Sequence, residues 1–168
     1  VDAIYVSHIH PDHYDERYFN FPKDIPLIIL DEGPNFLKKN LIKKGYNNFI
    51  EIKDSETKKF NEFELSMFKP FTGHIYEESL LGNLIDSALV LVDQGNTAIN
   101  FNDNTPDIKS CQKLKEKFKK IDLVMLNYNA AGPYPSCFDN LSENQKLSEN
   151  KRILKRNFDY LCEIIPTL

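Results

Sequence analysis

The apolar and polar positions along this chain fall into short blocks that predict strands and helices in alternation. Residues 1–6 and 26–30 are apolar runs with the length and composition of buried strands. Between residues 35 and 44 the apolar positions lie at helical spacing, and Gly45 stands where that helix is expected to end. Such an alternation of strands and helices is typical of an α/β fold.

The second part of the chain continues the alternation. Residues 48–52 and 63–68 are expected to be strands separated by a charged turn at 53–59. Two apolar runs then flank a Gln-Gly-Asn turn at 94–96, which indicates a hairpin. The pattern further predicts a lysine-rich amphipathic helix over 108–120, a strand over 122–126, a polar loop over 140–150 and a helix over 151–165.

The four histidines all lie where they could hold a metal ion. Three of them fall in the sequence SHIHPDH at residues 7–13, directly after the first predicted strand. Residues two apart in extended backbone point the same way, so His8 and His10 can converge on one ion. Pro11 disfavours helical geometry at His10, and a turn beyond it can bring Asp12 and His13 to a neighbouring position. Three imidazoles and one carboxylate form a ligand set that zinc prefers.

This H-x-H-x-D-H pattern after a strand resembles the signature of the metallo-β-lactamase superfamily. The resemblance implies that His8 and His10 bind one metal ion together with a later lone histidine. It also implies that Asp12 and His13 bind a second ion, and that a distant aspartate bridges the two. The fold implied is an αβ/βα sandwich with the metal centre on loops at one edge of its sheets.

The remaining two ligands follow from the same resemblance. His74, in the sequence FTGH, matches the later lone histidine. Asp103 matches the bridging aspartate, because it stands at the exit of the second hairpin strand and 29 residues after His74. Asp93 and Asp107 are its rivals. Asp93 lies at the hairpin turn, where aspartate is common for backbone reasons, and Asp107 can cap the helix expected from residue 108.

A second resemblance concerns the segments around Asp103 and residues 127–138. Asn100-Phe101-Asn102-Asp103 and the sequence NYNAAGPYPSCF are similar to motifs in the metallo-β-lactamase-like portion of CMP-N-acetylneuraminate hydroxylase and its bacterial relatives in surface-polysaccharide gene clusters. The paired cysteine and histidine ligands of the Rieske centre in the full hydroxylase do not occur in this chain. Tyr128, Tyr134 and the Gly132-Pro133 turn form either a substrate-facing loop or a rigid connector, and both readings stay open.

Length and composition agree with a single domain over residues 1–168. Hydrophobic residues make up 41% of the chain, and no apolar run has the roughly 18 to 20 residues that a membrane span needs. A net charge of −4 gives no general attraction to nucleic acid. Cys111, Cys137 and Cys162 are odd in number and widely spaced, which favours reduced thiols and a cytoplasmic location.

The resemblance also leads us to expect that the sandwich is incomplete at both ends. The first predicted strand already leads into the histidine cluster, whereas superfamily members have several strands before it. They usually continue into a further strand beyond the last predicted helix, and that strand can carry a final ligand for the second ion. No histidine follows His74, so that ligand is not supplied in this form here.

The function expected from the sequence is a metal-dependent hydrolase that acts through a metal-activated water at a dinuclear centre. Asp12 is the candidate catalytic residue, because it could hold the water as well as the metal. The two divalent ions are expected to be zinc, since flavo-di-iron relatives usually carry glutamate in place of His10, although iron and manganese also suit these ligands. The expected substrate is a small molecule, in glycan or nucleotide-sugar metabolism, with no nucleic-acid or membrane partner. Two alternatives stay open: a metal-binding module of a larger CMP-sialic-acid-hydroxylase-like oxidoreductase, and a truncated non-catalytic domain.

Overall fold

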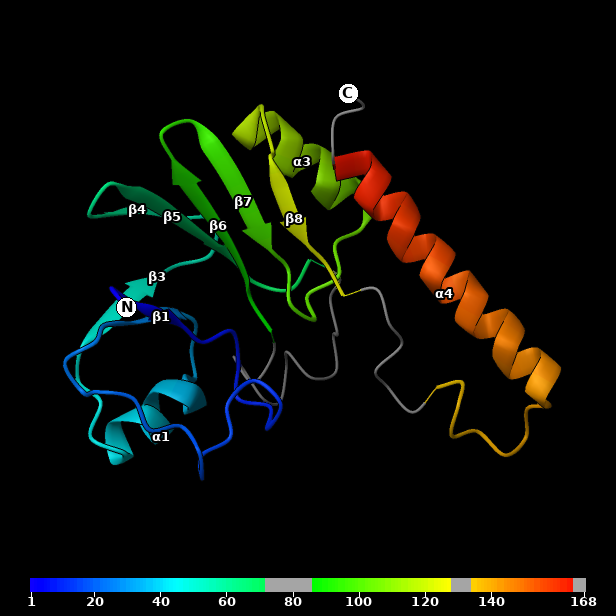
Figure 1. The fold of residues 1–168 in the computed structure, drawn as a ribbon, viewed down its shortest axis with the longest axis horizontal. Helices are drawn as coiled ribbons and strands as arrows, with labels where there is room; N and C mark the ends of the chain where they lie inside the picture. The colour runs from blue at the N-terminus through cyan, green and yellow to red at the C-terminus, as the bar shows by residue number, and fades with distance from the viewer. Residues whose placement is uncertain (72–85, 128–133, 165–168) are drawn as a thin grey trace.

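The computed structural model describes residues 1–71, 86–127 and 134–164, and in it two β-sheets are stacked between helices (Figure 1). The first sheet is parallel and has the order β1-β2-β3, with strands Ile4–Tyr5, Leu27–Leu30 and Phe49–Ile52. The second sheet has the order β4-β5-β6-β7-β8, with strands Thr57–Phe60, Phe63–Phe68, Ala88–Asp93, Asn96–Asn100 and Leu123–Met125. Its pairs are antiparallel except β7 with β8, which is parallel. The helices are α1 (Phe36–Lys43), α3 (Ile108–Phe118) and α4 (Glu143–Ile164).

Strand β2 shows why the first sheet is buried on both sides. Successive side chains of a strand point to opposite faces, so its four apolar residues divide into two pairs. Leu27 and Ile29 pack with Leu41 of α1. Ile28 and Leu30 point the other way, into the cluster that also contains Met67 of the second sheet. The continuous apolar run therefore predicts a strand covered on both faces, as found.

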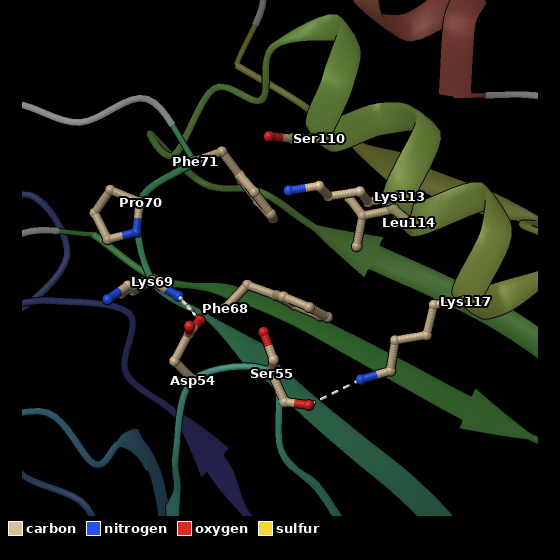
Figure 2. Close-up of a pocket in the computed structure, with 10 residues that line it drawn as sticks. All are labelled: Asp54, Ser55, Phe68, Lys69, Pro70, Phe71, Ser110, Lys113, Leu114 and Lys117. Atoms are coloured by element: carbon tan, nitrogen blue, oxygen red, sulfur yellow. Dashed lines mark hydrogen bonds between the residues drawn. The ribbon is translucent and has the colours of Figure 1, made fainter.

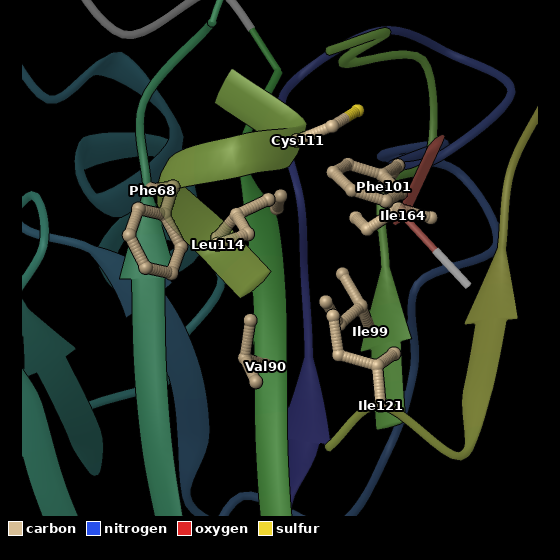
Figure 3. Close-up of a cluster of buried hydrophobic side chains, with 9 residues drawn as sticks. Phe68, Val90, Ile99, Phe101, Cys111, Leu114, Ile121 and Ile164 are labelled. Carbon is tan, nitrogen blue, oxygen red and sulfur yellow. The ribbon is translucent and has the colours of Figure 1, made fainter. Parts of the chain in front are cut away.

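The outer face of the second sheet is covered by α3, and the C-terminal end of α4 joins it through Ile164 (Figure 3). Val90 and Ile99, from adjacent strands β6 and β7, pack against Leu114 of α3 and Ile164 of α4. The layers therefore run in the order helix, sheet, sheet, helices. This arrangement confirms the predicted αβ/βα sandwich.

Two predicted elements were wrong. The charged turn at 53–59 is shorter than expected, because β4 begins at Thr57 as an edge strand with alternating half-buried and exposed residues. Lysines are common on such edges, since they prevent further strand pairing. Their charge made this segment look like a turn in the sequence. The polar loop at 140–150 is instead the first part of α4, which begins at Glu143.

A capping box explains the early start of α4. The Ser142 hydroxyl accepts a hydrogen bond from the Gln145 backbone N–H at 3.4 Å, and the Ser142 backbone N–H donates to Gln145 Oε1 at 2.9 Å. This reciprocal pair is the S-x-x-Q form of the motif that begins helices. Polar residues after it are compatible with a helix because most of that turn is exposed to solvent.

Of the other local predictions, those for Gly45 and the cysteines hold, whereas the first strand was predicted too long. Gly45 has φ +87 just beyond α1, a conformation that glycine adopts without steric penalty. The first strand is shorter than residues 1–6, because only Ile4–Tyr5 pairs with β2. The three cysteines are free thiols, and burial raises the pKa of Cys111 to about 11. Within the described segments, we find no helix whose length and apolarity would let it cross a bilayer.

Asp107 is the N-cap of α3, where its carboxylate accepts a hydrogen bond from the Ser110 backbone N–H at 2.8 Å. That bond holds the pKa of Asp107 below its usual value. We expect Asp107→Ala to lower the free energy of unfolding by about 1 kcal/mol, because one helix-end donor loses its partner. Urea denaturation followed by circular dichroism measures the loss. Asp107→Asn, which preserves a good cap, should stay within a few tenths of a kcal/mol of the unsubstituted protein. Equal losses in both variants would contradict a capping role.

Candidate metal centre

The histidine cluster lies in the loop that leaves β1. His10 C=O accepts hydrogen bonds from the backbone N–H groups of His13 at 2.9 Å and Tyr14 at 2.7 Å, so the chain turns tightly just after Pro11. The loop therefore turns where the sequence predicts it. His8 is buried with 1% of its surface exposed, whereas His10 is exposed.

His8 and His10 face each other through their ring nitrogens. His8 Nε2 lies 2.8 Å from His10 Nδ1, and the rings meet edge to face with centroids 4.5 Å apart. Two imidazole nitrogens at this separation attract each other only if one donates a proton or both direct lone pairs at a cation. Residues two apart thus converge, as extended backbone predicts.

The Nε2 atom of His13 faces two carboxylates. His13 Nε2 lies 3.1 Å from Asp103 Oδ2 and 3.6 Å from Asp12 Oδ2. A carboxylate is only an acceptor, so a favourable contact with a ring nitrogen needs a proton or a metal ion between them. The side chain of Asp12 is 72% exposed, which leaves its second oxygen open to solvent.

Asp103 reaches the cluster from the end of β7 through a short polar turn. Asn102 has φ 51, and its backbone N–H donates to Asn100 Oδ1 at 3.0 Å. The Asn102 side-chain amide donates to the Tyr5 hydroxyl at 3.2 Å. Burial raises the pKa of Tyr5 above its ordinary value, so Tyr5 stays neutral and donates in turn to Ser87 C=O at 2.6 Å. The Asn-x-Asn-Asp motif thus has a structural role: its asparagines hold the turn that presents Asp103.

The other oxygen of Asp103 is held from β8 and α4. Asn127, just after β8, donates from its side-chain amide to Asp103 Oδ1 at 3.1 Å. The C=O of Asn127 accepts a hydrogen bond of 3.0 Å from the side-chain amide of Asn157 in α4. Asn157 is buried although it is polar, which agrees with this fixed contact.

Sequence reasoning missed Asp86, a buried carboxylate behind the cluster. Asp86 Oδ1 lies 3.1 Å from His8 Nδ1 and accepts the Ser87 backbone N–H at 2.7 Å. Asp86 Oδ2 accepts the backbone N–H of Asp103. The one sequence signal was an aspartate next to the apolar run of β6, and that pattern is too common to single it out.

The structure therefore brings together five of the six predicted ligands: His8, His10, Asp12, His13 and Asp103. The sixth, His74, lies outside the described residues, as do Tyr128, Gly132 and Pro133. Of the rivals to Asp103, Asp107 caps α3 and Asp93 ends β6 opposite Asn96. Tyr134 is partly exposed and packs edge-on against Phe138, with centroids 5.1 Å apart.

The donor atoms suit a transition metal. One donor each from His8, His13 and Asp103 lie within 4.8 Å of one another. Two metal–ligand bonds of about 2.0–2.2 Å together span about 4.4 Å, so donors at this separation are close to the spacing that a metal centre requires. Imidazole nitrogen with carboxylate oxygen is a set that zinc and iron both accept. The residues present therefore fit a metal ion.

A surface hollow of about 330 Å³ beside α3 is separate from this cluster (Figure 2). Its floor is Phe68 of β5 and Leu114 of α3, and none of the five grouped residues lines it. The ammonium group of Lys117 lies 5.1 Å above the Phe68 ring and donates to Ser55 C=O at 2.9 Å. The hollow thus belongs to the contact between α3 and the second sheet.

Solved structures define the class of fold. The chain is similar to CmlA, a diiron β-hydroxylase from Streptomyces venezuelae (15% identity, TM-score 0.56, 98% of this chain and 33% of that one). It is similar to isothiocyanate hydrolase from Delia radicum gut bacteria, with 23% identity and a TM-score of 0.58 over 77% of this chain and 50% of that one. It is also similar to the metallo-β-lactamase fold protein YhfI from Bacillus subtilis, with 17% identity and a TM-score of 0.52 over 79% of this chain and 52% of that one. The chain has the metallo-β-lactamase-like fold.

Relatives in sequence carry a different kind of name. A protein of Mycolicibacterium smegmatis is 30% identical over 181 residues, covering 99% of this chain, and one of Mycobacterium tuberculosis is 31% identical over 147 residues, covering 82%. Both are named Rieske 2Fe-2S iron–sulfur proteins, and the chain spans only 32% and 26% of their respective lengths. No family model matches the chain. Neither name mentions CMP-N-acetylneuraminate, so that closer resemblance stays a prediction.

Proposed function

We propose that this chain forms the metal-binding portion of a larger Rieske-type iron–sulfur oxidoreductase. The observation that carries the proposal is the similarity of nearly the whole chain to about one third of a relative with a Rieske name. The fold is compatible with this role, since CmlA, described as a diiron β-hydroxylase, shares it. The motif around Asp103 and the sequence of residues 127–138 add the resemblance to CMP-N-acetylneuraminate hydroxylase. We therefore propose a nucleotide-linked sugar as the substrate class.

The cluster residues have distinct roles in this proposal. His8 and His10 would hold one ion, with His74 as their third partner. Asp12 and His13 would hold a second ion, and Asp103 would contribute to the binding of both. Bound iron would supply Lewis acidity and one-electron redox chemistry at this place. All six ligand roles rest on the sequence motif and, for the five described residues, on their proximity.

Burial divides the cluster into a fixed side and an open side. His8 is enclosed and held from behind, so it orients the centre. His10, Asp12 and Asp103 are exposed, so a substrate approaches from their side. On that side Asp12 has an oxygen free to accept a proton or to hold a water molecule. Asp12 is therefore the residue that we propose for proton transfer, as general acid–base chemistry requires a group within hydrogen-bond reach.

A metal-dependent hydrolase is the second candidate, and His10 favours it. A neutral imidazole at this position adds no negative charge to the ligand set, whereas a carboxylate would add one. Histidine is a common ligand of zinc, which has no redox chemistry. Flavo-di-iron relatives usually carry glutamate here. In this candidate Asp12 would orient the attacking water instead of serving an oxidation.

Electron demand separates the two candidates. Hydroxylation by molecular oxygen takes two electrons from a donor, places one oxygen atom in the product and releases the other as water, whereas hydrolysis takes none. The experiment purifies the complete protein encoded by the gene and incubates it with CMP-N-acetylneuraminate, with and without a reductant and oxygen. We expect a hydroxylated product only when both are present, and a reduced Rieske signal by electron paramagnetic resonance.

The matched control is His10→Ala in the same complete protein. It should retain the Rieske signal, because the iron–sulfur ligands lie elsewhere, while product formation falls to background. Cleavage of the substrate by water in the absence of reductant, with no hydroxylated product, would favour the hydrolase. A complete protein without a Rieske signal would overturn the oxidoreductase proposal.

A further inference from the structure

Asp86 is a buried carboxylate whose two oxygens point to two different sides of the histidine cluster. It is only 6% exposed, and it precedes β6, so it lies where the two sheets approach the loops. Its Oδ1 faces His8 Nδ1 at 3.1 Å, while its Oδ2 accepts the backbone N–H of Asp103. Neither partner is close to residue 86 in the sequence. One side chain thus connects the loop after β1 to the turn after β7.

Two groups lie beside the Nδ1 atom of His8: the Ser7 hydroxyl at 3.0 Å and Asp86 Oδ1 at 3.1 Å. The Ser7 hydroxyl can either donate or accept, whereas an ionised carboxylate only accepts, so the pair with Asp86 is favourable when His8 Nδ1 carries the proton and the hydroxyl then accepts or turns away. The Nε2 atom of a neutral His8 then keeps its lone pair, and this is the atom that faces His10 Nδ1 at 2.8 Å. Asp86 therefore favours the tautomer and the ring orientation that metal binding needs.

The contact with Asp103 fixes the second wall of the cluster. A hydrogen bond to the Asp103 backbone N–H restrains the turn that begins at Asn102, where φ is 51. The Asp103 side chain then lies 3.1 Å from His13 Nε2. Two candidate ligands from distant segments therefore depend on one buried side chain.

From these contacts we infer that Asp86 is a positioning residue of the metal centre, holding His8 by its ring and Asp103 by its backbone. The inference rests on the proposed metal-binding function. Asp86 does not itself bind the ion. Carboxylates that orient metal-binding histidines usually contribute a factor of about 10 to 100 in metal affinity.

The choice of substitution follows from the two oxygens. Asp86→Asn has nearly the same shape but only one acceptor oxygen, so either the His8 ring N–H or the Asp103 backbone N–H faces an amide N–H instead. We expect a loss of about 10-fold to 100-fold in affinity for Zn²⁺ or Co²⁺, measured by competition with a chromophoric chelator. The Co²⁺ absorption spectrum should also change, because His8 is less well oriented. Asp86→Ala should lose at least as much.

A matched control exists in Asp122, which also accepts a backbone N–H, that of Thr97 at 2.8 Å, and is not part of the cluster. Asp122→Asn changes the net charge by the same amount and should leave metal affinity within a factor of two. Thermal melts of both metal-free variants show whether each is folded. A folded Asp86→Asn variant with unchanged affinity would overturn the inference and leave the proposed function intact.

A second readout needs no metal. In the metal-free protein, the nitrogen chemical shifts of His8 should report the tautomer protonated at Nδ1, and Asp86→Asn should shift the population toward the other tautomer. A wild-type His8 protonated at Nε2 would overturn the inference even if affinity fell. A wild-type protein that binds no metal under any condition would overturn both the inference and the proposed function.

Discussion

Replacing both His8 and His10 by alanine should remove the metal from purified residues 1–168, down to the background of elemental analysis. Their facing ring nitrogens lie 2.8 Å apart, and His8 is the buried residue of this pair. Without them, the remaining described donors are exposed or half-buried carboxylates and one imidazole, which hold a transition metal poorly. The same analysis identifies the metal, and it counts one or two ions per chain. Iron supports the oxidoreductase, and zinc supports the hydrolase.

Two controls make this experiment decisive. His10→Ala alone changes an exposed side chain, so it should lower metal content without loss of folding. Asp107→Asn changes the rival carboxylate, which caps α3, and should keep the full metal content. If the double variant keeps its metal, the ion is bound elsewhere and the dinuclear centre is wrong. If the Asp107→Asn variant loses its metal, Asp107 and not Asp103 is the bridging aspartate.

The second large effect concerns the core below the site. Phe101→Ala should lower the free energy of unfolding by about 3–5 kcal/mol, because a fully buried aromatic side chain leaves a cavity. Phe101 is 0% exposed and packs in the cluster between the second sheet and α3, with its ring 5.8 Å from that of Phe71 (Figure 3). Since a typical domain is stable by about 5–15 kcal/mol, the loss is a large part of the total.

Circular dichroism in urea measures this loss, and the chain contains no tryptophan whose fluorescence could serve instead. Phe158→Ala is the matched control: the same substitution on α4, at a side chain that is 62% exposed. It should change stability by no more than about 0.5 kcal/mol. Similar losses in the two variants would mean that Phe101 is not enclosed as described.

The sequence predicts those elements whose determinants are local. β2 could be predicted because it is a run of four consecutive apolar residues, which are buried on both faces. α3 could be predicted because Asp107 caps a helix with periodic apolar positions. β4 was missed because an edge strand with one solvated face can be rich in lysine. The start of α4 was missed for a different reason: the Ser142–Gln145 capping box was present, but the polar composition after it suggested a loop.

The candidate site shows the same division. The first cluster lies within one loop, so its spacing in the sequence already determines which side chains converge. Asp103 needed the resemblance to a family, because nothing local connects it to residue 8. Asp86 could not be found at all, since its role exists only once the fold brings it next to both His8 and Asp103. Asn127 escaped notice as a partner of Asp103 for the same reason.

The distance along the chain between the ligands has a thermodynamic consequence. His13 and Asp103 are separated by 90 residues, so an ion held by both closes a long loop in the way a disulfide does. In the unfolded chain such closure costs entropy that grows slowly with loop length, and unfolding therefore releases the ion. The melting temperature should then rise with free metal concentration, by an amount set by the ratio of that concentration to the dissociation constant. The stability of the folded chain would thus depend on the supply of metal.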